Sequence, residues 1–196
     1  YSDYAQTMRT FVNGLVELGW ISGRPPEITK ESPMPYWDWL AHCQSAHLVF
    51  RSEDAYSAGW DEQERRRIRA ELLDRLRAGS LDLVIAMGTW AGQDLANSTH
   101  SVPVLVMSTS DPVGAGIVKS EADSGLDHVT ARVDSTRYIR QLRMFHRIVG
   151  FKTLGVAFED TPDGRIYSSV KEVEQVAQER GFQTVFCPVT DTIADT

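Results

Sequence analysis

Two short polar segments, each directly after a run of apolar residues, hold the side chains best suited to binding a small molecule. The first segment consists of Gly88, Thr89, Trp90 and Ala91, and the second contains Thr109, Ser110 and Asp111. In the first, the glycine permits close approach to the backbone, and the threonine hydroxyl can donate to an anion. In the second, hydroxyls precede a carboxylate that suits an ammonium group. Each segment also fits a purely structural turn, which at Asp111 would form before Pro112.

No residue pattern typical of an enzyme accompanies these segments. The sequence has no nucleophile elbow, phosphate-binding loop or HExxH zinc motif, and its five histidines show no metal-ligand spacing. We therefore expect no catalytic residue, no metal and no other cofactor. A run of arginines at 65–67, with Arg69, alternates with glutamates. This alternation favours a solvated helix face over a nucleic-acid-binding surface.

The composition is that of a globular α/β protein and disfavours nucleic acid as a partner. Its 196 residues include 20 Lys and Arg against 27 Asp and Glu, a net charge of −7. No apolar run reaches the roughly 18 residues that span a bilayer, and we expect any export signal to have been removed. Cys43 and Cys187 are far apart in sequence, and we expect both to be buried and unbridged.

Four segments have apolar residues at helical spacing, and each is followed by a glycine suited to a left-handed helix end. The predicted helices cover 3–18, 61–76, 138–149 and 170–177, followed by Gly19, Gly79, Gly150 and Gly181. Asp61 and Glu64 have the spacing of a capping box at the start of the second helix.

Short runs rich in branched residues lie between these helices. We predict strands at 81–87, 102–107, 153–158 and 184–186, with a weaker candidate at 47–50. Strands that alternate with helices indicate an α/β fold with parallel sheets flanked by helices, buried on both faces. In such a sheet ligands bind beyond the carboxyl ends of the strands, where both polar segments lie.

Breaks in this rhythm suggest how the chain is divided. Residues 22–46 combine prolines with aromatic residues, which suggests an ordered excursion, and the periodicity stops between residues 111 and 127. We predict an N-terminal α/β lobe at 1–116 and a C-terminal α/β lobe at 117–196. The second is short for a three-layer lobe, so we expect it to be incomplete.

Several segments resemble substrate-binding proteins of ABC importers of the tryptophan/tyrosine type. Residues 11–20, FVNGLVELGW, resemble the family's opening helix FxxGLxELGY, and residues 82–91, DLVIAMGTWA, resemble DLIVAxGTxA. Residues 102–118, which include DPVGAGIV, resemble IPVVFxxVxDPVxAGLV, the most specific of these motifs. Residues 152–156, KTLGV, resemble the start of KxIGVLYNP.

The resemblance implies a type I periplasmic binding fold, in which two lobes close on a small ligand such as an amino acid or related carboxylate. It implies that the Gly88–Ala91 turn holds the carboxylate and that Asp111 and its neighbouring hydroxyls face the cationic end. Residues 160–168 would approach from the other lobe, with Tyr167 as a stacking group. The implied partner is a membrane ABC permease, and the implied location is periplasmic or extracytoplasmic. A ligand-sensing domain of a signalling system is the alternative, and an α/β enzyme formed by residues distant in sequence is a further one.

Overall fold

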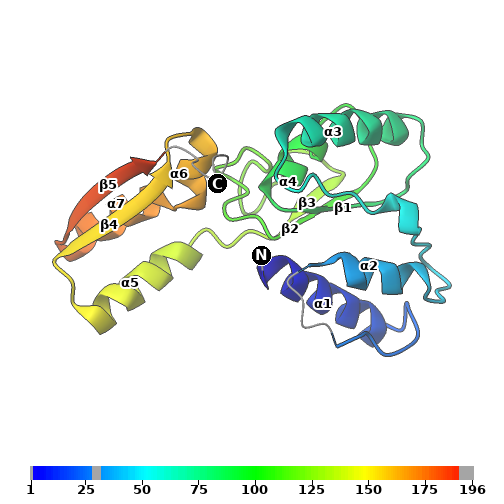
Figure 1. Ribbon diagram of the computed structural model, residues 1–196, viewed down its shortest axis with the longest axis horizontal. Helices are drawn as coiled ribbons and strands as arrows, with labels where there is room; N and C mark the ends of the chain where they lie inside the picture. Colours follow the sequence, from blue (N-terminus) through cyan, green and yellow to red (C-terminus); the bar gives the residue numbers. More distant parts are fainter. Residues whose placement is uncertain (1, 28–31, 190–196) are drawn as a thin grey trace.

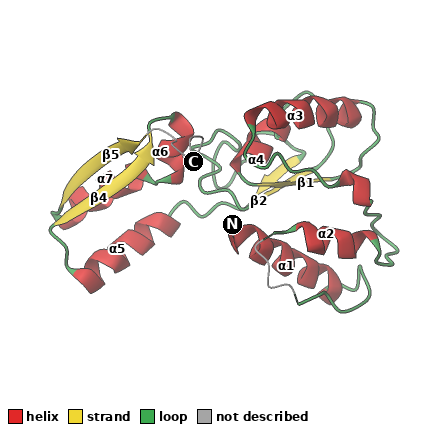
Figure 2. Ribbon diagram, viewed as in Figure 1, coloured by secondary structure: helices red, strands yellow, loops and turns green. Residues whose placement is uncertain are grey.

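The computed structural model describes residues 2–27 and 32–189, which form two lobes, each with its own parallel sheet (Figure 1). Residues 28–31 of the expected excursion lie outside the described residues, as do residues 1 and 190–196 of the expected lobes. Figure 2 shows that helices accompany both sheets, as the alternating sequence pattern predicted. The α/β fold class is therefore confirmed.

The first lobe contains a three-stranded parallel sheet in the order β1-β2-β3, together with the first four α-helices. Its elements are α1 (Ser2–Glu17), α2 (Met34–Ala41), the 3-10 helix η1 (Ser52–Asp54), α3 (Glu62–Arg77), β1 (Val84–Met87), α4 (Thr89–Leu95), β2 (Val104–Met107) and β3 (Val129–Ala131).

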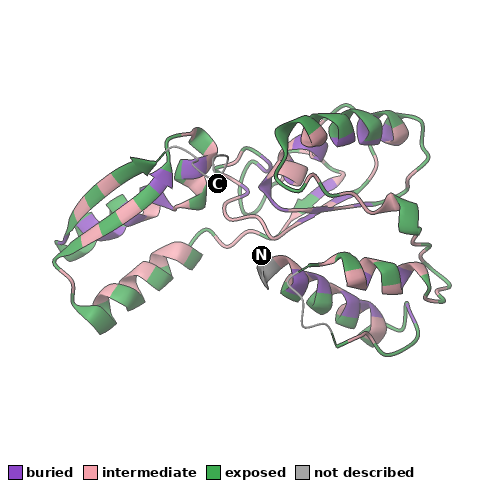
Figure 3. Ribbon diagram, in the orientation of Figure 1, coloured by how far each residue is buried: buried purple, intermediate pink, exposed green. Residues whose placement is uncertain are grey.

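Alternate residues of β1 face different layers of this lobe. Val84 and Ala86 of β1 are buried in one apolar core together with side chains of α3, whereas Met87 packs against the second core, which α1 and α2 form. This alternation is the two-residue period of a strand between two layers of helices. Figure 3 shows the buried positions of α1 and α3 turned toward the interior of the lobe.

The second lobe is thinner. Its elements are α5 (Arg137–Val149), β4 (Thr153–Glu159), α6 (Pro162–Tyr167), α7 (Val170–Arg180) and β5 (Gln183–Val189). A small core of Val176, Ala177 and Phe182 forms where helix side chains meet β4. Within β4 only Phe158 is buried, and β5 has no buried residue.

The four predicted helices are confirmed, and Gly19, Gly79, Gly150 and Gly181 all have the left-handed backbone expected after them. The Asp61 side chain accepts from the Glu64 N–H at 2.7 Å, as the capping box predicted. Part of the proline-rich excursion forms α2, so that segment is ordered.

Three expectations about the strands and cysteines were wrong. Residues 47–50 form no strand, because Leu48 and Phe50 instead pack as loop residues against the α1–α2 core. The strands of the second lobe are not buried on both faces, because α5 and α7 supply the apolar contacts on one side. Both cysteines are free, as predicted, but Cys43 is half-buried and Cys187 is exposed.

The expected boundary between residues 116 and 117 falls inside the first lobe of the structure. Ile117 and Val118 are buried in its core, and β3 pairs in parallel with β2 beyond that point. The reason is that the glycine-rich stretch returns to the same sheet instead of leaving it. We propose a later boundary, at residues 132–136 between β3 and α5.

Among the described residues, no helix is both long and apolar enough to cross a membrane.

Candidate functional site

The first side of the candidate site is the edge where β1 and β2 end. The two strands run in parallel and in register, so that Met87 lies opposite Met107. The Gly88 N–H donates to the Met107 carbonyl at 2.8 Å, which holds the two following loops together. The predicted polar segments that begin at Gly88 and Thr109 are therefore neighbours, as expected for the carboxyl edge of a parallel sheet.

The N-terminal turns of α1 cover this edge of the sheet. Gly88 has a φ of 91°, and a Cβ atom placed there would lie 2.0 Å from the Tyr4 hydroxyl oxygen. Only glycine therefore fits against this tyrosine without displacement. One strand further along, the Ser108 hydroxyl donates to Thr7 Oγ1 at 2.8 Å, and Ser108 itself has a φ of 55°. Such a left-handed conformation is uncommon in residues other than glycine, so the backbone of Ser108 is strained at the end of β2.

Two threonine hydroxyls occupy the starts of the loops after β1 and β2. Thr89 begins α4 and is only 5% exposed. Thr109 Oγ1 is buried and has no hydrogen-bond partner within the described part of the chain. A buried hydroxyl without a partner loses its hydration without compensation, so it is suited to meeting a polar group of a ligand.

The second side of the site is α6 of the other lobe. Burial raises the pKa of the Tyr167 hydroxyl, as does the charge of Asp163, whereas the nearby Thr89 hydroxyl acts in the opposite direction. The Gln93 side-chain amide of α4 donates to Asp163 Oδ1 at 3.2 Å. Thr89 and Gln93 of the first lobe thus meet Tyr167 and Asp163 of the second.

The segment expected to approach as a loop, residues 160–168, is mostly the short helix α6. Thr161 begins it by accepting from the Gly164 N–H at 2.9 Å. Tyr167 also lines a cavity of ≈ 340 Å³ that is bounded by side chains of α5 and α7. Tyr167 therefore lies between this cavity and Thr89.

The two other members of the first polar segment point elsewhere. The Trp90 ring lies 4.6 Å from the Arg65 guanidinium carbon and 5.4 Å from the Trp60 ring, centre to centre. Ala91 packs against the core of the first lobe. Gly88 and Thr89 therefore lie where the lobes meet, whereas Trp90 and Ala91 pack α4 against the first lobe.

Asp111 forms a turn, which is the structural role that the sequence also allowed for it. Its Oδ1 accepts from the N–H of Val113 at 3.1 Å and of Gly114 at 2.9 Å, which closes a turn. Ser110 beside it is half-buried. This hydrogen bonding within the loop uses one of the two carboxylate oxygens, and the contact of Asp111 with an ammonium group stays a prediction.

Sequence reasoning missed Tyr4, Gln93 and Asp163 as members of this site. Tyr4 precedes the recognised motifs and Asp163 follows them, and neither residue belongs to a sequence motif that indicates a binding role. Gln93 lies within the helix α4. A signal exists only for Asp163, which falls in the segment 160–168 that was expected to cross from the second lobe.

The side chains at this site supply hydrogen-bonding groups. Hydroxyl groups, a side-chain amide and one carboxylate are present, and no group of three or more metal-ligating side chains exists among the described residues. These groups can orient a small polar molecule through hydrogen bonds.

Comparisons with known proteins agree with this chemistry. Residues 57–193 match the sequence profile of the family described as ABC transporter substrate binding protein. No curated protein matches the chain significantly. Among solved structures, the ABC domain from Streptococcus pneumonia in complex with L-Trp has 20% identity and a TM-score of 0.61, covering 96% of this chain and 54% of that one.

Two further solved structures show the same fold. A conserved domain protein from Vibrio cholerae has 18% identity and a TM-score of 0.55, and covers 96% of this chain and 54% of its own. An ABC transporter substrate-binding protein from Desulfitobacterium hafniense in complex with Leu has 16% identity and a TM-score of 0.53, with coverages of 98% and 48%. The chain thus spans about half the length of these structures. Since the family profile matches most of the chain, the protein belongs to the ABC transporter substrate-binding protein family.

Proposed function

We propose that this protein binds a small organic molecule, an amino acid or related carboxylate, between its lobes and delivers it to a membrane permease for import. The observation that carries this proposal is the contact between the helix that begins at Thr89, directly after β1, and α6 of the other lobe, where Gln93 Nε2 donates to Asp163 Oδ1 at 3.2 Å. An extracytoplasmic location follows from this role. No covalent step is required, because capture and release need only hydrogen bonds and movement of the lobes.

The polarity of the site supports a carboxylate at the first lobe. The backbone after Gly88 and the hydroxyls of Thr89 and Thr109 are uncharged donors, and one of these hydroxyls lacks a partner in the described chain. A ligand carboxylate bound beside Thr89 would gain these donors. The solved structures that share the fold include complexes with L-Trp and with Leu, which places amino acids first among the molecules to test.

A thermal-shift screen of the 20 L-amino acids and of small carboxylates tests this proposal. We expect at least one compound to raise the melting temperature in a concentration-dependent manner. Thr89→Val removes the buried hydroxyl with little change in volume and should abolish that rise or shift it to roughly tenfold higher concentration.

Thr10→Val is the matched control, since Thr10 is exposed on α1 and its hydroxyl donates only to the Gln6 carbonyl of its own helix. The control should respond to the compound as the wild type does. A compound that stabilises wild type and Thr89→Val equally would place its binding site elsewhere and overturn the proposal.

A further inference from the structure

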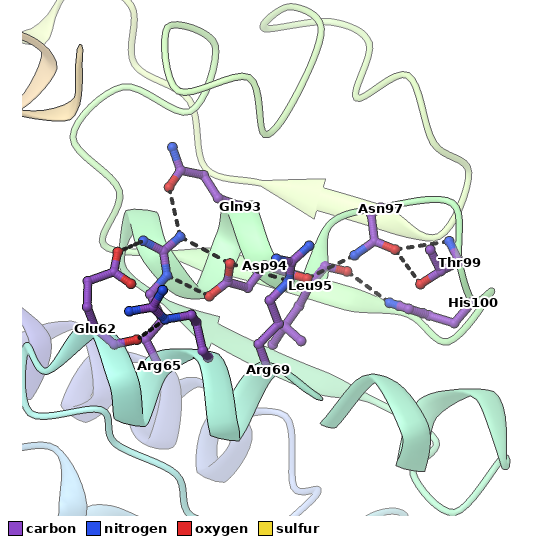
Figure 4. A network of polar contacts seen from close by, with 10 residues as sticks. Glu62, Arg65, Arg69, Gln93, Asp94, Leu95, Asn97, Thr99 and His100 are labelled. Carbon is purple, nitrogen blue, oxygen red and sulfur yellow. Dashed lines mark hydrogen bonds and ion pairs between the residues drawn. The ribbon is translucent and has the colours of Figure 1, made fainter. Parts of the chain in front are cut away.

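Arg65 departs from the solvated helix face that its sequence surroundings predicted. Its side chain is 16% exposed, whereas that of Arg67 in the same helix is 59% exposed. Arg67 pairs only with Glu64 and Glu71 of α3, at i,i+3 and i,i+4 spacing. Arg65 instead crosses from α3 to α4 (Figure 4).

Three contacts join Arg65 to α4. Its Nε and Nη2 donate to the two carboxylate oxygens of Asp94 at 2.8 and 3.0 Å, a bidentate pair in which Asp94 is 12% exposed. Its guanidinium lies over the Trp90 ring. Its Nη2 also donates to Gln93 Oε1 at 3.3 Å, so that one side chain engages Trp90, Gln93 and Asp94, which lie two, five and six positions after Gly88.

The contact with Gln93 fixes which way that amide points. Because Gln93 Oε1 accepts from Arg65, its Nε2 is left to donate, and it does so to Asp163 Oδ1 of α6 and to the Ala115 carbonyl at 3.4 Å. Burial acts to lower the pKa of Arg65, and the hydrogen bond with Asp94, aided by the charge of Asp163, outweighs it. The chain of contacts therefore runs from α3 through α4 into the second lobe.

We propose that Arg65 is a positioning residue: through Gln93 it holds Asp163, and with it α6 and Tyr167, against the ligand-binding turn at Thr89. This inference rests on the proposed function only in regarding Thr89 as the ligand contact. The arginine itself touches no ligand. It raises the fraction of molecules in which α6 lies against the turn at Thr89, and thereby raises the apparent affinity for the ligand.

The distance between the lobes, measured without ligand, tests this role. The free cysteines lie one in each lobe, Cys43 after α2 and Cys187 in β5, so spin labels on both report the separation by pulsed electron resonance. Loss of one interlobe hydrogen bond should raise the population of molecules with separated lobes roughly two- to tenfold. We expect this for Gln93→Ala, for Asp163→Ala and for Arg65→Gln.

Two controls separate positioning from general damage. Arg67→Gln removes a neighbouring arginine of α3 whose partners are local and should leave the distance distribution unchanged. Asp163→Asn keeps an oxygen acceptor for Gln93 and should restore a distribution close to that of the wild type. Arg65→Gln removes the bidentate partner of the buried Asp94, which keeps its ion pair with Arg69 at 3.7 Å. If this variant unfolds, Gln93→Ala and Asp163→Ala decide the matter.

Unchanged distributions in Gln93→Ala and Asp163→Ala, with melting temperatures equal to that of the wild type, would overturn the proposal. Because no ligand is present, this outcome differs from failure of the proposed function. The proposed function fails if no compound in the screen raises the melting temperature in a way that requires Thr89. This result does not depend on the measured distance between the lobes.

Discussion

At Asp111 the carboxylate turns back onto its own loop, where Oδ1 accepts from the N–H groups of Val113 and Gly114. A Cβ atom on Gly114 would lie 2.1 Å from Asp111 Oδ2, so the glycine is part of the same turn. The sequence allowed both a ligand contact and a turn at this position. The close packing of the turn favours the second.

Asp111→Ala should therefore lower the free energy of unfolding by about 1 kcal/mol, the usual contribution of a side chain that satisfies backbone N–H groups of a turn. Urea unfolding followed by circular dichroism measures this change. Asp82→Ala, at an exposed position, serves as the control and should unfold as the wild type does. Unchanged stability of Asp111→Ala with weakened binding of the compound found by thermal shift would return Asp111 to the ligand site.

Among single residues, the sequence predicts those whose role is local and misses those whose partner lies far along the chain. Gly88 and Thr89 follow a strand directly, so their place at the sheet edge follows from the strand itself. The partner of Arg65 is Asp94, 29 residues away in another helix, and alternating charges around Arg65 suggested solvent. Spacing along one helix contains no information about that pair.

The helices α1, α3, α5 and α7 and most strands could be predicted because each has a periodic pattern and a defined end, whereas α2 and α6 were not predicted. The strand β3, Val129–Ala131, is only three residues long and has too little pattern to be seen. Missing it also placed the lobe boundary too early, since pairing of β3 with β2 returns the chain to the first sheet. The exposure of β4 and β5 could not be predicted either, because apolar runs show that a face can be buried but not what covers it.

The start of α5, where the second lobe begins, depends on an ion pair that responds to pH. Arg140 donates to both carboxylate oxygens of Asp134, at 2.7 and 3.1 Å, and this hydrogen bonding lowers the pKa of Asp134. A carboxylate with a lowered pKa stabilises the folded state above its ordinary pKa, and this contribution is lost as pH falls through the lowered value.

Carboxyl-carbon NMR titration should give Asp134 a pKa below the ordinary value of about 3.9 for aspartate. In Arg140→Gln the pKa should return to the ordinary range, because the charge-assisted hydrogen bonds are gone. An Asp134 pKa that is equal in wild type and Arg140→Gln would show that the pair does not form in solution.

In the whole molecule, each lobe has its own buried core, and α4 of the first lobe contacts α6 of the second through the hydrogen bond from Gln93 to Asp163. The sequence predicted that a segment of the second lobe would approach the turn after β1. It could not predict that Tyr167 lies beside Thr89, because that placement depends on the relative position of the lobes. A ligand bound between the lobes is therefore required to contact both Thr89 and α6.

Backbone amide NMR of the labelled 196-residue chain, titrated with the compound that raises the melting temperature most, tests this requirement directly. We predict the largest shifts at Gly88, Thr89 and Thr109 of the first lobe and at α6 of the second, appearing together at one ligand concentration. Shifts confined to the residues that line the cavity between α5 and α7, with Thr89 unmoved, would contradict a binding site between the lobes.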